Sequence, residues 1–181
     1  MLPGHGPHHP QFLVLHWLTW TEAQDEAGYS ALVDKLGSYG VGYNAVWWDG
    51  SVRWMTPEGD RAYHAGGSPG MTDANGNSLG LAVPYISPSL RPRGLEGEVE
   101  LPFSARDATG KTRETVAWYP PIDGWILRDS VLWAREVFIR RGWPRVCVYT
   151  HACINPQKID IRNLGINCGV THGELNSLFT E

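Results

Sequence analysis

Two histidines of this sequence lie at or near the ends of short apolar segments rich in β-forming residues. His16 belongs to the segment 11–17, and His151 directly follows the segment 145–150. Short apolar runs of this kind are typical of buried strands. If the two strands are neighbours, their imidazoles converge, and a carboxylate would complete three metal ligands with a fourth position for water. That is the arrangement of a catalytic zinc site.

The carboxylate candidate is Asp160, which ends the stretch HACINPQKID that begins at His151. Pro156 favours a turn that brings this loop back over the metal. Thiolates also bind zinc, so Cys153 and Cys168 are alternatives for the third position. The chain has three cysteines, and this odd number excludes a disulfide-stapled framework. We expect the cysteines to be small buried residues.

Further strands are expected to build the sheet that positions these residues. The segment 44–55 contains two β-prone runs separated by Asp49-Gly50, a dipeptide typical of a type I′ hairpin turn. Residues 78–83 form another short strand candidate. These segments predict a sheet to which the hairpin belongs.

Three helices are expected. The spacing of apolar residues is loosely helical over 26–39. It is clearly helical over 125–141, where Gly142 is the stop signal. A short helix over 172–179 closes the chain.

Residues 84–123 separate the strand 78–83 from the long helix by far more than an ordinary connection. They are rich in proline, glycine and charge, and we expect an inserted flap that contacts the substrate or its surroundings. Within it, 98–104 and 112–118 predict a β-hairpin.

Composition and charge narrow the class of protein. With 181 residues, of which 42% are apolar, the chain is expected to form a single domain, 1–181. A formal net charge of -4 gives no attraction to nucleic acid or to an anionic membrane. No apolar run is long enough to cross a membrane, and the start, MLPGHGPHHPQ, lacks the features of a signal peptide. We expect a protein made in the cytoplasm, with a flexible Pro/His-rich end.

Five segments spread over most of the chain carry a resemblance. They are LVLHW (13–17), GYNAVWWDGSV (42–52), AYHAG (62–66), NSLGL (77–81) and HACINPQKID (151–160). In this order they resemble the zinc-dependent N-acetylmuramoyl-L-alanine amidases, which include amidase-type phage endolysins, cell-wall recycling amidases and peptidoglycan recognition proteins. The resemblance implies an α/β fold in which one central mixed β-sheet is flanked by helices.

The same resemblance implies a set of site residues. His16, His151 and Asp160 match the zinc ligands of the family. Lys158 and Tyr43 match the residues that stabilise the oxyanion, and a lysine ammonium or a tyrosine hydroxyl suits that role chemically. Zinc is therefore the expected cofactor, and it would activate water and polarise the amide carbonyl.

Two further residues are candidate substrate contacts. His64 looks like the family histidine that faces the groove, and Asn77 is a second candidate, with a turn-forming role as its alternative. The sequence also departs from the family. The residues after Asp160 are not the Pro-Gly of many members, and Ala82 stands where the recycling enzymes carry a glutamate. The first departure leaves the cysteines open as the third ligand, and the second, together with Tyr43 and Lys158, makes the resemblance closer to the phage branch.

The resemblance implies hydrolysis of the amide bond between N-acetylmuramic acid and L-alanine in peptidoglycan. The expected protein is a phage or prophage endolysin, monomeric, with peptidoglycan as its partner and the bacterial cell wall as its place of action after release. Two alternatives stay open. One is a peptidoglycan-binding module without catalysis, and the other is an amidase of the same fold that acts on soluble muropeptides.

Overall fold

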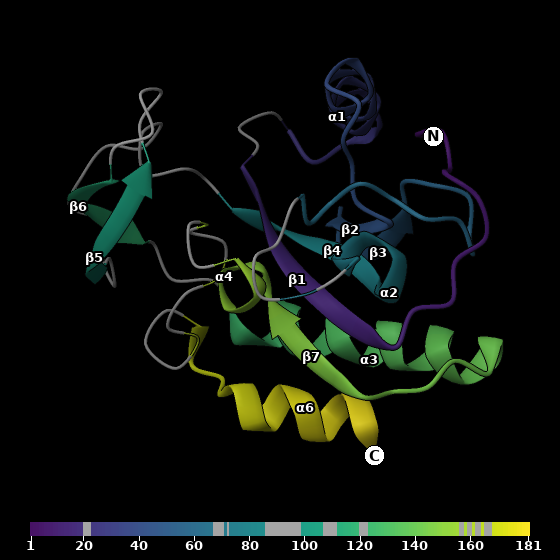
Figure 1. The fold of residues 1–181 in the computed structure, drawn as a ribbon. Coiled ribbons are helices and arrows are strands. Elements are labelled where there is room, and N and C mark those ends of the chain that lie inside the picture. The colour runs from purple at the N-terminus through teal and green to yellow at the C-terminus, as the bar shows by residue number, and fades with distance from the viewer. Residues whose placement is uncertain are drawn as a thin grey trace.

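The structure contains a five-stranded mixed sheet with helices on both faces and a separate two-stranded sheet (Figure 1). The computed structural model describes residues 1–19, 23–66, 71, 73–85, 99–106, 112–119, 123–155, 158, 161, 164 and 168–181. The main sheet is formed by β1 (Phe12–Thr19), β2 (Ala45–Trp48), β3 (Ser51–Trp54), β4 (Ser78–Tyr85) and β7 (Cys147–Thr150). The helices are α1 (Glu26–Ser38), α2 (Ala74–Asn77), α3 (Gly124–Arg141), α4 (His151–Ile154) and α6 (His172–Thr180). The separate sheet is the hairpin of β5 (Val99–Arg106) and β6 (Thr112–Tyr119).

Strand β1 lies between β4 and β7 and runs parallel to both. The strand order is β3-β2-β4-β1-β7, and β3 is antiparallel to β2. A strand with parallel neighbours is covered on both faces, which explains why β1 has a nearly continuous apolar sequence. The predicted strand is confirmed but continues to Thr19, so His16 lies within it and not at its end.

One face of β1 packs against α3 and α6 and forms the largest core cluster. Leu13 and Leu15 of the strand are fully buried there, together with Phe138 of α3 and Phe179 of α6. The two phenylalanine rings meet edge to face, with centroids 4.9 Å apart. A truncation such as Phe138→Ala at such a site costs about 3–5 kcal/mol, because it leaves a cavity in a closely packed interior. This core covers the face of the sheet that packs against α3 and α6. The candidate site lies on the opposite face.

The long helix predicted over 125–141 is confirmed as α3, and the short one over 172–179 as α6. At the C-terminus of α3, Gly142 has a φ of 66°, a left-handed conformation that glycine adopts without strain. None of the helices that the structure describes is long and apolar enough to cross a membrane.

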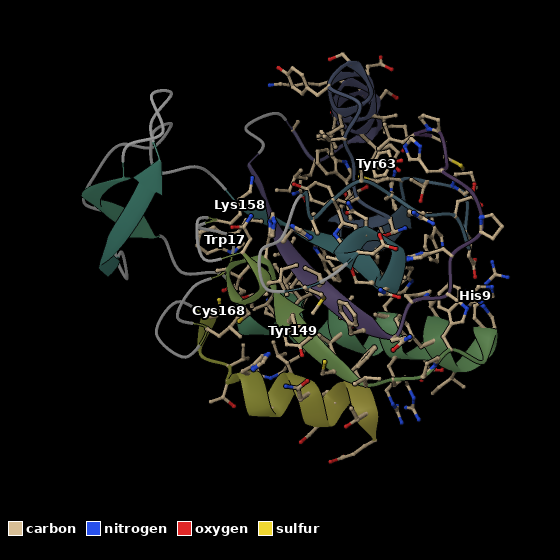
Figure 2. The ribbon with its side chains drawn as sticks, viewed as in Figure 1. His9, Trp17, Tyr63, Tyr149, Lys158 and Cys168 are labelled. Carbon is tan, nitrogen blue, oxygen red and sulfur yellow. The ribbon has the colours of Figure 1, made fainter. Side chains whose placement is uncertain are left out.

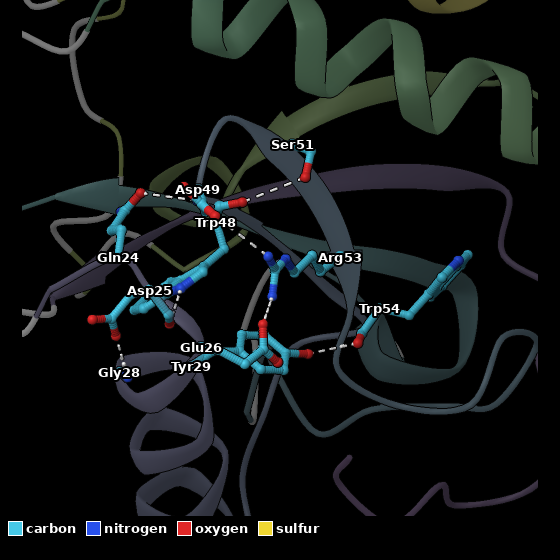
Figure 3. Close-up of polar contacts among 10 residues, drawn as sticks. All are labelled: Gln24, Asp25, Glu26, Gly28, Tyr29, Trp48, Asp49, Ser51, Arg53 and Trp54. Carbon is cyan, nitrogen blue, oxygen red and sulfur yellow. Dashed lines mark hydrogen bonds and ion pairs between the residues drawn. The ribbon is translucent and has the colours of Figure 1, made fainter.

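Helix α1 and the β2–β3 hairpin are joined by side-chain contacts (Figure 3). Arg53 forms an ion pair with Glu26, at 2.6 Å, and the Tyr29 hydroxyl donates a hydrogen bond of 2.7 Å to the backbone carbonyl of Trp54. The indole N–H of Trp48 donates to the backbone carbonyl of Asp25, the N-cap residue of the helix. The helix and the hairpin were both predicted, but their mutual contacts come from tertiary packing.

The turn of that hairpin has the predicted geometry. Asp49 has a φ of 51° and Gly50 a φ of 74°, the positive values that a type I′ turn requires. The turn matches the twist of the two strands and thereby fixes their register, in which Trp48 pairs with Ser51.

Residues 1–10 pack on the domain, so the prediction of a flexible end is wrong. The N–H of Leu2 donates to the carbonyl of Met55, and the N–H of His8 donates to that of Gly59. Leu2 and His8 are buried. The segment stays in place because an apolar side chain and an imidazole enter the core, which its Pro/Gly-rich composition does not reveal.

The hairpin predicted inside the insertion is confirmed by β5 and β6, which lie apart from the main sheet (Figure 1). The first residues of the expected insertion, 84 and 85, belong to β4 instead. The role of the insertion stays a prediction. The helices α2 and α4 were not predicted, because each is only four residues long.

The expectation that the cysteines are small buried residues is confirmed for Cys168, which lies in the main core cluster, and is wrong for Cys153. Cys153 is exposed on α4, where it accepts a hydrogen bond of 3.1 Å from the Thr150 hydroxyl. Cys147 is half-buried.

Candidate metal centre and active site

The parallel register of β1 and β7 places His16 beside His151. Leu15 of β1 pairs with Thr150, the last residue of β7, so His16 and the first residue of α4, His151, follow this pair on neighbouring chains. The two imidazoles are buried, and their ring centroids are 4.4 Å apart. The convergence of the two rings that sequence spacing suggested is therefore present in the fold.

A cavity of about 580 Å³ opens above these two histidines. Tyr43, His64 and Lys158 line it as well, so five of the predicted site residues share one cavity. The ring centroids of Tyr43 and His16 are 5.1 Å apart, and Lys158 is exposed at the cavity. Figure 2 shows Lys158 at one end of the sheet and His9 at the other.

His64 is the third imidazole of the cavity, and it is also buried. Its Nδ1 lies 2.9 Å from Nε2 of His16, and its Nε2 lies 3.2 Å from the hydroxyl of Ser78. Burial lowers the pKa of His64 well below its usual value, and the neighbouring His16 lowers it further. His64 is therefore a neutral, hydrogen-bonded ring. It contacts a candidate metal ligand directly, while its role as a substrate contact stays a prediction.

The donor atoms at the cavity fit zinc in part. Two buried imidazoles that line one cavity suit this ion, which binds nitrogen at histidine. Among the side chains that the structure describes, no group of three or more His, Cys, Asp or Glu residues is arranged to hold a metal ion. Asp160, the predicted third ligand, lies outside the described residues. The two histidines thus fit part of a zinc site, and the third ligand stays a prediction.

The remaining candidate, Asn77, belongs to α2, and its amide donates a hydrogen bond of 3.2 Å to the backbone carbonyl of Asp73. Among the described residues of that helix, Asn75 is the one that lines the cavity. The two asparagines differ in position because successive residues of a helix point in different directions.

Sequence reasoning missed several residues of the cavity wall, and three of them offer side chains that a ligand can contact. Val41 and Tyr63 line it, and both are 46% exposed, so they offer an apolar edge to a ligand. Asn75 is the third. A signal was present for two of them, because Val41 immediately precedes the segment 42–52 and Tyr63 lies within the segment 62–66, beside the predicted His64.

No family model and no curated protein sequence matches the chain. Among solved structures, a mutant endolysin from Bacillus subtilis matches with a TM-score of 0.51 and 14% sequence identity, covering 89% of this chain and 81% of that one. The chain has the fold of that endolysin. The α/β fold with a central mixed sheet, expected from the family resemblance, is therefore confirmed.

A second structure is the N-acetylmuramyl-L-alanine amidase AmiD from E. coli, in complex with the substrate anhydro-N-acetylmuramic acid-L-Ala-D-gamma-Glu-L-Lys. It matches with a TM-score of 0.47 and 19% identity, over 85% of this chain. The match covers 52% of that protein, so the chain corresponds to about half of its length.

Proposed function

We propose that this protein is a zinc-dependent peptidoglycan amidase that hydrolyses the bond between N-acetylmuramic acid and L-alanine. The observation that carries the proposal is the pair of buried imidazoles, His16 and His151, side by side in a cavity that Tyr43 and Lys158 also line. The endolysin fold supports it. A cavity of about 580 Å³ is within the usual size of small-molecule sites, so it suits one sugar with the start of its peptide.

His16 and His151 would hold the zinc ion together with Asp160. When bound, zinc lowers the pKa of a water molecule to about 7 and polarises a carbonyl group. The protein contributes two imidazoles that burial and packing have already oriented, so little ordering is needed when the metal binds.

Lys158 and Tyr43 act on the amide carbonyl. As water adds to the carbonyl carbon, its oxygen gains negative charge, and the Lys158 ammonium and the Tyr43 hydroxyl stabilise that oxygen by donating hydrogen bonds. Val41 and Tyr63 form the exposed apolar edge of the cavity and suit the apolar faces of a sugar or an acyl group.

The biological role is proposed to be that of a phage or prophage endolysin. The protein would be made in the cytoplasm, act as a monomer and reach the cell wall after release. A net charge of -4 provides no attraction to an anionic wall, so contact with peptidoglycan must come from the cavity and its surroundings.

The direct test is to incubate the purified protein with peptidoglycan, with and without a zinc chelator, and to identify the released fragments by mass spectrometry. We expect stem peptides with a free L-alanine amino group, and no release in the chelator. His16→Ala and His151→Ala should lose both zinc and cleavage. His9→Ala is the matched control, because this exposed histidine lies at the opposite end of the sheet (Figure 2).

Other outcomes separate the alternatives. Binding to peptidoglycan without release would identify a recognition module and overturn the proposed catalysis. Cleavage of soluble muropeptides but not of intact sacculi would replace the wall with a soluble substrate. Full activity of a metal-free His16→Ala protein would contradict the zinc mechanism.

A further inference from the structure

Two consecutive residues, His64 and Ala65, lie against the Nε2 atoms of the two candidate zinc ligands. The Nε2 of His16 is 2.9 Å from Nδ1 of His64. The Nε2 of His151 is 3.4 Å from the backbone carbonyl of Ala65. One short segment therefore contacts both imidazoles at the same ring position.

The proton of His151 can be placed from the chemistry of its neighbour. A carbonyl oxygen carries lone pairs and no hydrogen, so it can only accept a hydrogen bond. The contact with the Ala65 carbonyl therefore requires the hydrogen of His151 to be on Nε2. In a neutral imidazole the lone pair is then on Nδ1.

The proton of His64 follows from the contacts of its Nε2. This atom is 3.4 Å from the backbone carbonyl of Ser78 and 3.2 Å from the Ser78 hydroxyl oxygen. That hydroxyl donates its own hydrogen to the carbonyl of Ala74, at 2.5 Å. Both neighbours of the Nε2 are thus acceptors, so the hydrogen of His64 is on Nε2 and its Nδ1 accepts.

The proton of His16 follows in turn. Because Nδ1 of His64 is an acceptor, the hydrogen bond of 2.9 Å requires His16 to donate from Nε2. Its lone pair is then on Nδ1, as in His151. A metal binds the lone pair of an imidazole, and the hydrogen bond made by the other nitrogen decides which atom this is.

Asn75 holds the segment that makes these contacts. Its side-chain oxygen accepts hydrogen bonds from the backbone N–H groups of His64, at 3.0 Å, and of Ala65, at 2.8 Å. Ala65 is fully buried and His64 nearly so. The Asn75 side chain thus fixes the backbone of His64 and Ala65, and Ser78 fixes the ring of His64.

We propose that His64 and Ala65, held by Asn75, set the tautomer and the ring orientation of His16 and His151, so that both bind zinc through Nδ1. His64 and Asn75 are then positioning residues of the metal centre. The inference rests on the part of the proposed function that makes these histidines zinc ligands, and it is independent of which amide is cleaved.

The tautomers can be measured without metal and without variants. Nitrogen-15 NMR of the histidine rings in the metal-free protein at pH 8 distinguishes a proton on Nε2 from one on Nδ1. We expect Nε2–H in His16, His64 and His151. A proton on Nδ1 in His16 or His151 would overturn the proposal.

Zinc affinity tests the energetic role, measured by competition with a chromogenic chelator. His64→Ala should weaken zinc binding by about 10–100-fold, the usual effect of removing a partner of a metal-binding histidine. His64→Asn should recover most of it, because an amide oxygen can take the place of Nδ1. Unchanged affinity in a folded His64→Ala protein would contradict the inference.

Zinc affinity also tests the role of Asn75, which holds the backbone of His64 and Ala65. Asn75→Ala should also weaken zinc binding, while Asn75→Asp keeps the accepting oxygen and should retain most of it. Thr171→Ala is the control, because it removes a side-chain acceptor of a backbone N–H, that of Glu174, on the opposite face of the sheet. It should lower the melting temperature and leave zinc affinity unchanged. If Thr171→Ala lost as much zinc affinity as Asn75→Ala, general destabilisation would explain both losses. That result would overturn the positioning role of Asn75.

Different experimental results would follow from a failure of this inference and from a failure of the proposed function. If wild-type protein cleaves the amide but the tautomers differ from those expected, the function stands and the positioning role fails. If the tautomers and the zinc affinities are as expected but no amide is cleaved, the positioning role stands and the amidase proposal fails.

Discussion

The ring of His64 occupies the space where a side chain on Gly80 would lie. A Cβ atom at Gly80 would be 2.3 Å from Cγ of His64 and 2.5 Å from its Nδ1, the atom that contacts His16. Gly80 cannot move away easily, because its N–H donates to the Asn44 side chain at 2.8 Å and its carbonyl accepts from the Asn44 N–H at 2.9 Å. The glycine therefore decides where the His64 ring can be.

Gly80→Ala should displace the His64 ring while leaving every side chain of the cavity chemically intact. Overpacking of this kind costs about 1–3 kcal/mol of folding free energy, and zinc affinity should fall as in His64→Ala. Thermal unfolding and chelator competition measure the two effects. Gly173→Ala is the control, because the nearest atom to its Cβ is at an ordinary 3.9 Å. Wild-type zinc affinity in Gly80→Ala would show that the ring position is unimportant.

Tyr43→Phe should lower kcat without loss of zinc. The phenylalanine ring keeps the packing against His16, whose centroid is 5.1 Å away, and removes only the hydroxyl. Loss of one donor to a developing oxyanion typically reduces kcat by about 100–1,000-fold. Steady-state kinetics on a soluble muropeptide and zinc analysis of the same sample check both parts. An unchanged kcat would remove the hydroxyl from the mechanism.

Lys158→Met should behave in the same way, because methionine keeps much of the side-chain length and removes the charge. Lys158 is exposed at the cavity, so the substitution should leave the melting temperature close to that of the wild type. A fall in kcat of about 100-fold is expected. A rise in KM alone, with kcat unchanged, would indicate that Lys158 binds the substrate and does not stabilise the transition state.

His8 should make folding stability depend on pH in the acid range. Burial, assisted by the positive charge of Arg61, lowers the pKa of His8 from 6.5 to about 4. Its Nε2 has no hydrogen-bond partner among the described residues. The unfolded chain therefore takes up this proton at a higher pH than the folded protein does. The stability present above pH 6.5 is lost as the pH falls towards 4, by up to about 3 kcal/mol.

The measurement is urea unfolding of the wild type and of His8→Gln at several pH values between 7 and 4. The difference in unfolding free energy between the two proteins should change over this range, with the wild type losing more. The adjacent exposed His9 provides the control, since His9→Gln should follow the wild type. Parallel curves for wild type and His8→Gln would refute the prediction.

Two glycine substitutions should have opposite effects on stability. Gly142→Ala places a Cβ in open space but at a φ of 66°, and should cost about 1 kcal/mol. Gly37→Ala lies inside α1, where its Cβ meets only the end of Leu2 at 3.4 Å, and should gain about 0.5–1 kcal/mol. Thermal unfolding of the two variants checks both signs. A stabilised Gly142→Ala protein would contradict the left-handed cap.

Local patterns in the sequence determined most of the secondary structure. The dipeptide Asp49-Gly50 predicted its hairpin turn because few residues adopt two successive positive φ angles. The apolar spacing of 125–141 predicted α3, since one face of that helix must be buried. The convergence of His16 and His151 was expected if their two strands are neighbours, and the pairing of β1 with β7 meets that condition.

Tertiary structure alone decided how those histidines are held. The contacts of His64 with His16 and Ser78 join residues 48 and 14 positions apart in the chain, and the Asn75 clamp depends on a four-residue helix with no sequence signal. The burial of His8 likewise depends on where the N-terminal segment packs. Sequence spacing specifies which residue types lie on each strand, whereas the hydrogen-bond partner of a ring nitrogen depends on distances between elements, which only the packed fold fixes.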